Sequence, residues 1–122
     1  MYLVDKNKDK RSSMRKMVSA SVRYEMKSTR EFGSALACDI SEGGLRLNFN
    51  KFIPSNTDFL LQLNLPSAAK IINAVGKVMW AQRIPHSERY QLGISFKEMH
   101  DKQRTEISDY LNRLPEKVIN PI

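Results

Sequence analysis

Hydrophobic and polar residues alternate along most of the middle of the chain. Val18, Ala20, Val22, Tyr24 and Met26 are separated from one another by single polar residues. A spacing of two places apolar side chains on one face of a β-strand, so this segment is predicted to be a strand with one buried face. The same pattern predicts five further strands, at about residues 32–40, 45–49, 59–65, 70–83 and 90–96.

Two of these segments carry finer expectations. In the second, the alternation assigns four residues to one face: Phe32, Leu36, Cys38 and Ile40. In the fifth, Gly76 interrupts the run of side chains, which is typical of a β-bulge or a bend.

The period changes near the end of the chain. Apolar and amphipathic residues then recur at helical spacing: Gln103, Ile107, Tyr110, Leu111 and Leu114. Asp101 is predicted to cap this helix and Pro115 to end it. Short strands followed by one helix favour a mainly β fold, a six-stranded antiparallel β-barrel with a C-terminal α-helix. The apolar stripe of the helix would cover an open end or a flank of the barrel.

The 122 residues fit one domain. Residues 1–16 show no hydrophobic period and are expected to form a flexible basic arm, residues 17–98 the barrel, and residues 99–122 the helix and tail. The net charge of +7 is concentrated in the arm. This favours either a solvated arm or one that closes over an anion.

Composition also excludes several classes of protein. No apolar run approaches the roughly 18 residues of a membrane-spanning helix, and the N-terminus lacks a signal-peptide pattern, so a cytoplasmic protein is expected. The single cysteine and the two separated histidines, His86 and His100, form no metal or catalytic constellation. We therefore expect neither an enzyme nor a metal or cofactor site.

Arg11 and Arg15 form the first candidate motif, R-x-x-x-R. A guanidinium group is flat, stacks on bases, and donates paired hydrogen bonds to guanine or to phosphate. Two arginines on one short segment would suit a guanine nucleotide. The alternative is that they are simply part of a basic arm.

Asp39, Ser41 and Gly44 form the second motif, D-x-S-x-x-G, between two predicted strands. A carboxylate accepts hydrogen bonds from N1–H and the exocyclic amine of guanine. A serine hydroxyl suits a base or a phosphate, and Gly43 or Gly44 would permit a positive φ and a close ligand. The alternative is a turn that Asp and Ser cap through their own backbone.

Taken together, the stretches "KRSSMRK", "VRYEM", "ACDISEGGLRL", "GKVMWAQR" and "YQLGISF" resemble a PilZ domain over about residues 10–114. The resemblance implies a six-stranded barrel with a C-terminal helix that binds the bacterial second messenger cyclic di-GMP. The family pattern R-x-x-x-R falls on Arg11 and Arg15. The pattern D/N-x-S-x-x-G falls on Asp39, Ser41 and Gly44.

The resemblance also implies roles for these residues. Asp39 and Ser41 would sit on the barrel surface to read a guanine, and the arm would fold over the ligand and present a changed surface to an unidentified protein partner. Lys10, directly before R-x-x-x-R, would suit two stacked ligands. Additional candidates are Gly43, Arg46 and Trp80. Arg46 has the alternative of a solvated strand residue, and Trp80 that of a packing residue.

Two other functions stay open. One is a ligand-independent adaptor on the same fold. The other is a small barrel that binds nucleic acid by stacking bases on Tyr24, Phe49 and Trp80. The positions of these aromatics on the apolar faces of their strands argue against the second. Motility, adhesion or biofilm control would fit the family.

Overall fold

The computed structural model describes residues 15–65 and 70–113. Its elements, in chain order, are β1 (Lys16–Met26), β2 (Phe32–Ser41), β3 (Gly44–Phe49), β4 (Asp58–Leu65), β5 (Lys70–Arg83), β6 (Tyr90–Glu98) and α2 (Asp101–Arg113). Every predicted strand is present, and β5 has the predicted bounds. Lys10, Arg11, Leu114 and Pro115 lie outside the described residues.

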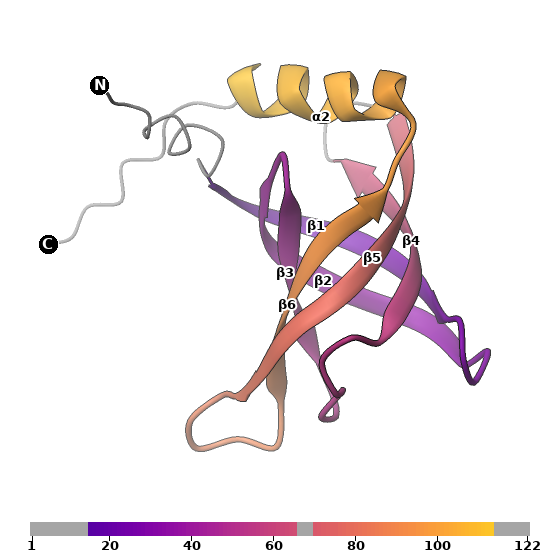
Figure 1. The fold of residues 1–122 in the computed structure, drawn as a ribbon. Coiled ribbons are helices and arrows are strands. Elements are labelled where there is room, and N and C mark those ends of the chain that lie inside the picture. The colour runs from indigo at the N-terminus through magenta and orange to yellow at the C-terminus, as the bar shows by residue number, and fades with distance from the viewer. Residues whose placement is uncertain (1–14, 66–69, 114–122) are drawn as a thin grey trace, which may run out of the picture.

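The six strands close into a barrel in the order β1-β2-β3-β6-β5-β4, and β4 pairs back onto β1 (Figure 1). All of these pairs are antiparallel. The predicted mainly β fold is therefore confirmed. Closure satisfies the backbone of each described strand on both sides, so the barrel presents its outer surface, and not a strand edge, to a ligand.

The predicted face of β2 is wrong because the strand contains a bulge. Ala37 pairs with Leu47 but Asp39 pairs with Arg46, which leaves Cys38 as an extra residue. The extra residue reverses the alternation. As a result Phe32 and Leu36 are exposed, by 80% and 46%. Ala37 is fully buried instead, whereas Ile40 is buried as its place on the apolar face predicted. Asp39 follows the extra residue and lies on the opposite face of the strand from Ile40.

The register of β5 shifts in two places. Between Val75 and Gly76 its pairing with β6 changes at the predicted position, but the extra residue is Lys97 of β6 and not a residue of β5. A second shift lies between Val78, which pairs with Ile94, and Trp80, which pairs with Gly93. Met79 is the extra residue there, and its side chain is exposed.

Helix α2 lies across one end of the barrel (Figure 1), where it buries Ile107, Tyr110 and Leu111. The predicted cap is wrong by one residue. The helix begins at Asp101, and the carbonyl of His100 accepts the first helical hydrogen bond, from the N–H of Arg104 at 3.0 Å. Among the described residues, no helix has the length and apolar character that a membrane span requires.

Candidate functional site

Asp39 lies at the centre of a cluster of charges. It is only 3% exposed, and each of its carboxylate oxygens is bound by an arginine. Arg15 Nη1 donates to Oδ1 at 2.7 Å. Arg46 Nε donates to Oδ2 at 2.7 Å, and its Nη2 lies 2.6 Å from the same oxygen. Burial of this carboxylate is tolerated because both oxygens have a charged donor.

The strand pairing brings these three residues together. Arg46 is the direct partner of Asp39 across β2 and β3. Arg15 directly precedes β1, whose Met17 pairs with Asp39. The first arginine of the R-x-x-x-R motif, Arg11, lies outside the described residues, as does Lys10. The structure therefore brings one of the two predicted arginines to the D-x-S-x-x-G motif.

Arg46 is not the solvated strand residue that the sequence favoured. Its hydrogen bond to Asp39 raises the pKa of the guanidinium above its usual value. A signal for this contact was present in the sequence. If Glu42 and Gly43 form a two-residue turn, then Ser41 faces Gly44, and counting outward places Asp39 opposite Arg46.

Ser41 holds the turn and does not face solvent. It is 3% exposed, its hydroxyl donates to the carbonyl of Gly44 at 3.3 Å, and it accepts from the N–H of Gly43 at 3.3 Å. The expectation that Asp39 and Ser41 are exposed on the barrel surface is therefore wrong, since each is only 3% exposed. The role seen for Ser41 is the turn-capping alternative.

The two glycines of the turn are not there for a positive φ, because neither adopts one. Gly44 is instead required by close packing. A Cβ at this position would lie 2.0 Å from the carbonyl oxygen of Ile94 on β6. A Cβ at Gly43 would meet nothing within 4 Å.

A hollow of about 240 Å³ lies beside these charges. It is lined by Arg15, Gly43, Gly44, Met79, Trp80, Gly93, Ile94 and Ser95. Trp80 packs against the backbone of Gly93, since a Cβ there would lie 2.2 Å from the indole Cε2. Trp80 therefore has the packing role that was the alternative for it, and 40% of the residue is nevertheless exposed. The hollow therefore combines an arginine with an accessible aromatic surface.

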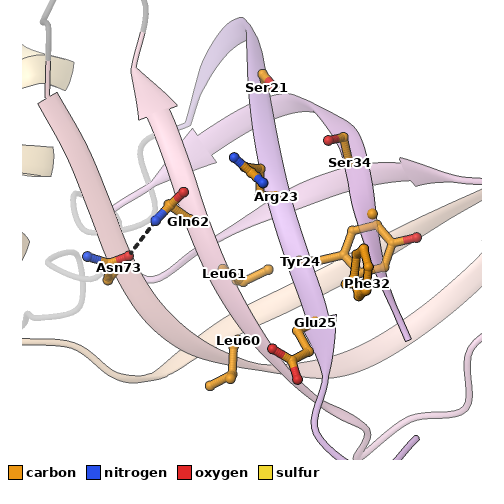
Figure 2. Close-up of a pocket in the computed structure, with 11 residues that line it drawn as sticks. Ser21, Arg23, Tyr24, Glu25, Phe32, Ser34, Leu60, Leu61, Gln62 and Asn73 are labelled. Carbon is orange, nitrogen blue, oxygen red and sulfur yellow. Dashed lines mark hydrogen bonds between the residues drawn. The ribbon is translucent and has the colours of Figure 1, made fainter. Parts of the chain in front are cut away.

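A larger hollow, of about 810 Å³, lies on the outer face of β1, β2, β4 and β5. Figure 2 shows its lining, with Arg23 and Glu25 on β1, Phe32 on β2, and the hydrogen bond from Gln62 to Asn73 at 3.4 Å. None of the predicted site residues lines it. The smaller hollow is therefore the candidate site, because Arg15, Gly43, Gly44 and Trp80 line it and Arg15 is bonded to Asp39.

The remaining polar candidates offer no further chemistry. Cys38 is half-buried, and desolvation raises the pKa of its thiol. His86 and His100 are exposed, as expected. Within the described ranges, no three His, Cys, Asp or Glu side chains are grouped so as to hold a metal ion.

A family model for the PilZ domain matches residues 9–113 of the chain. Among curated proteins, no match was found.

Several solved structures share the fold. An inhibitor of motility from Bacillus subtilis has a TM-score of 0.68 and 19% identity, covering 83% of this chain and 51% of its own. The complex of K. pneumonia MrkH with cyclic di-GMP has a TM-score of 0.67 and 19% identity, covering 81% and 49%. The PilZ domain of YcgR from Escherichia coli with cyclic di-GMP has a TM-score of 0.61 and 11% identity, covering 78% and 83%. The chain spans about half the length of the first two, and identities this low show a common fold only.

Proposed function

The chain belongs to the PilZ domain family, and on that premise we propose that it is a receptor for cyclic di-GMP. The observation that carries the proposal is the meeting of Arg15, Asp39 and the Ser41–Gly44 turn beside a hollow walled by Trp80. Two proteins of similar fold, MrkH and YcgR, have been solved with this ligand. A receptor of this kind needs no catalytic group, and we assign the chain no reaction and no cofactor.

Each group at the site suits one part of the ligand. Arg15 and Arg11 would bind phosphate oxygens and guanine edges, and a carboxylate oxygen of Asp39 would accept from N1–H and the exocyclic amine of a guanine. The exposed surface of Trp80 would stack on a base. Gly43 has no side chain and faces open space, so a ligand can approach the turn closely there.

The output would pass through the N-terminal arm. The arm carries R-x-x-x-R, and we propose that ligand phosphates neutralise and order it against the barrel. The ordered arm would change the surface that the receptor shows to a protein partner in the cytoplasm. Lys10 adds a further positive charge, which would suit a second, stacked ligand.

The proposed function is tested by calorimetric titration of the chain with cyclic di-GMP. We expect saturable heat, little or none with GTP, and loss of the heat in Asp39→Ala and in Arg11→Ala/Arg15→Ala. Arg23→Ala is the matched control, since it removes one arginine from the face of the other hollow. The molar ratio distinguishes one ligand from two. A folded wild-type protein that gives no heat would overturn the proposal and leave the ligand-independent adaptor.

The nucleic-acid alternative has lost its main support. Phe49 is 3% exposed, and its ring lies 4.9 Å from that of Tyr24, within an aromatic cluster that also contains Phe59. Of the three aromatics suggested for stacking, only Trp80 is substantially exposed. Single-strand binding usually relies on several stacked bases, and the three-ring platform suggested for it is not present, although Phe32 and Phe52 are exposed elsewhere on the described surface.

A further inference from the structure

We propose that Arg46 is the fixed cation that holds Asp39 for guanine recognition, and that Arg15 is the exchangeable partner that the ligand displaces from Asp39. This division of roles rests on the proposed function and assigns Arg46 a positioning role, not a contact with phosphate.

The two arginines bind Asp39 in different ways. Arg46 places both Nε and Nη2 on the single oxygen Oδ2, at 2.7 and 2.6 Å. Arg15 makes one contact, from Nη1 to Oδ1. Arg46 thus makes one hydrogen bond and a second close charged contact with Asp39, whereas Arg15 makes a single hydrogen bond. The Arg15 contact is therefore the weaker of the two.

The backbone also indicates that Arg15 is held less firmly than Arg46. Arg46 lies within β3 and pairs with Asp39 on one side and with Gly93 of β6 on the other. Its main chain is fixed by neighbours on both sides. Arg15 comes before the first residue of β1, outside the strand ladder. Arg15 can therefore leave Asp39 without disturbing a strand, whereas Arg46 cannot move away as easily.

A guanine cannot reach Asp39 unless one arginine leaves. Both carboxylate oxygens are occupied, and the residue is 3% exposed. The guanine edge presents donors at N1 and the exocyclic amine, so it needs a carboxylate oxygen that it can approach, and Arg15 covers Oδ1 of a residue that is almost fully buried. Departure of Arg15 would free Oδ1. Arg15 itself lines the hollow, with 40% of its side chain exposed, and would then be available to the ligand.

Arg46 has to stay for this exchange to be favourable. Guanine is neutral, so it replaces the hydrogen bond of Arg15 but not its charge. A buried carboxylate that lost both cations would be strongly destabilised. With Arg46 on Oδ2, Asp39 remains neutralised by one cation and is held at a fixed angle to the base. This geometry commits Nε and Nη2 of Arg46 to Asp39 and away from phosphate.

A double-mutant cycle with cyclic di-GMP separates positioning from phosphate contact. Arg46→Met should weaken binding by about 30-fold or more, because it leaves the carboxylate without a cation in the complex. In the Asp39→Asn background the same substitution should cost less than about 3-fold, because a neutral amide needs no cation. Arg46→Lys should retain part of the affinity, since it restores the charge but not the paired donors. Arg23→Met is the matched control and should bind like wild type.

The opposite results would overturn the assignment. An equal loss in both backgrounds would mean that Arg46 contacts the ligand directly, and no loss in either would mean that it plays no part. Absence of binding by wild type would be a failure of the proposed function itself and is seen in the same titration. Melting temperatures of all variants separate lost affinity from lost folding.

A second measurement uses the wild-type chain, so it does not depend on whether a variant folds or binds. In the NMR spectrum of the wild-type chain, the Nε–Hε signal of Arg46 should remain protected from water exchange when cyclic di-GMP saturates the protein. The side-chain signals of Arg15 should shift. A protected Arg15 together with a released Arg46 would reverse the two roles and refute the proposal.

Discussion

Two of the hollows on the outer surface of the barrel, the candidate site and the larger hollow on β1, β2, β4 and β5, differ in how their polar groups are used. At the smaller one, of about 240 Å³, Arg15 and Arg46 converge on a single buried carboxylate. At the larger one, of about 810 Å³, the polar groups are dispersed along the strands. There Gln62 donates a hydrogen bond to Asn73 (Figure 2). Glu25 pairs with Arg30, which does not line this hollow. Convergence of polar groups, and not the size of the hollow, therefore identifies the candidate site.

The two surfaces also differ in strand geometry. The pairings of β1 with β4 and of β4 with β5, which underlie the larger hollow, keep one register throughout. The register shifts lie in β1–β2, β2–β3 and β5–β6. Those at Cys38 and Met79 determine where Asp39 and Trp80 point. Bulges re-aim side chains at functional sites, and here they separate a binding surface from a regular sheet face.

The largest effect is expected at Gly44, which lines the smaller hollow and packs so closely against β6 that there is no room for a side chain. Gly44→Ala should destabilise the fold by about 3 kcal/mol or more, because the new Cβ would meet a carbonyl oxygen of the neighbouring strand. Gly43→Ala is the control from the same turn and should be close to wild type. Urea denaturation measures both. Similar stabilities for the two variants would show that β3 and β6 can separate locally and that Gly44 is not a steric requirement.

The next effect tests which hollow binds the ligand. Arg15→Ala should weaken cyclic di-GMP binding by at least about 100-fold, since it removes the guanidinium group that would bind the phosphates or the guanine edge of the ligand. Arg23→Ala, on the larger hollow, should leave affinity unchanged. Calorimetry of both variants decides the matter. If the Arg23 variant loses affinity and the Arg15 variant keeps it, the larger hollow is the binding site.

The fold was predictable because alternation records which face of each strand is buried. The prediction from alternation failed in β2, where Phe32 and Leu36 are apolar but exposed and an extra residue reverses the pattern. Nothing in the identities of Ala37 and Cys38 marks a bulge. Sequence patterns of hydrophobicity therefore determine the strands more reliably than their irregularities.

The candidate site was predictable only in part. The D-x-S-x-x-G motif marked the turn, and the count across that turn would have paired Asp39 with Arg46. The contact of Arg15 with Asp39 joins residues 24 positions apart and depends on the register of β1 with β2. Local sequence does not determine such a register. The roles of Lys10 and Arg11 stay predictions, since both lie outside the described residues.

A smaller effect on affinity is expected from Trp80, the exposed aromatic side chain of the smaller hollow. Trp80→Ala should weaken cyclic di-GMP binding by about 10-fold, the range expected for the loss of one stacked base. Phe32→Ala is the matched control, because Phe32 is the more exposed ring, at 80%, and lines the larger hollow. Calorimetric titration measures the two affinities, because Trp80 is the single tryptophan of the chain and its variant has no tryptophan fluorescence to follow. Equal affinities for Trp80→Ala and wild type would leave Trp80 with a packing role alone.

The smallest effect concerns an ion pair that lines neither hollow, between Lys97 of β6 and Asp58 of β4. The hydrogen bond from Lys97 lowers the pKa of Asp58 and raises that of Lys97. A carboxyl with a lowered pKa in the folded state stabilises the fold above its unfolded pKa of about 3.9. That contribution is lost as pH falls through the folded value. The pKa of Lys97 is raised above 10.5, so its contribution to stability is fully present below pH 10.5 and is lost as pH rises through the folded value.

Lys97→Met should therefore lower the melting temperature near neutral pH by at most about 3 °C, since exposed pairs contribute little. The difference from wild type should shrink as pH falls through the lowered pKa of Asp58 in the folded protein, because protonation of the carboxyl removes the ion pair. Thermal melts between pH 2.5 and 8 measure it. Affinity for cyclic di-GMP should be unchanged at neutral pH. A loss of affinity without a loss of stability would mean that charge far from Asp39 contributes to binding, and that convergence on one carboxylate is not what distinguishes the two surfaces.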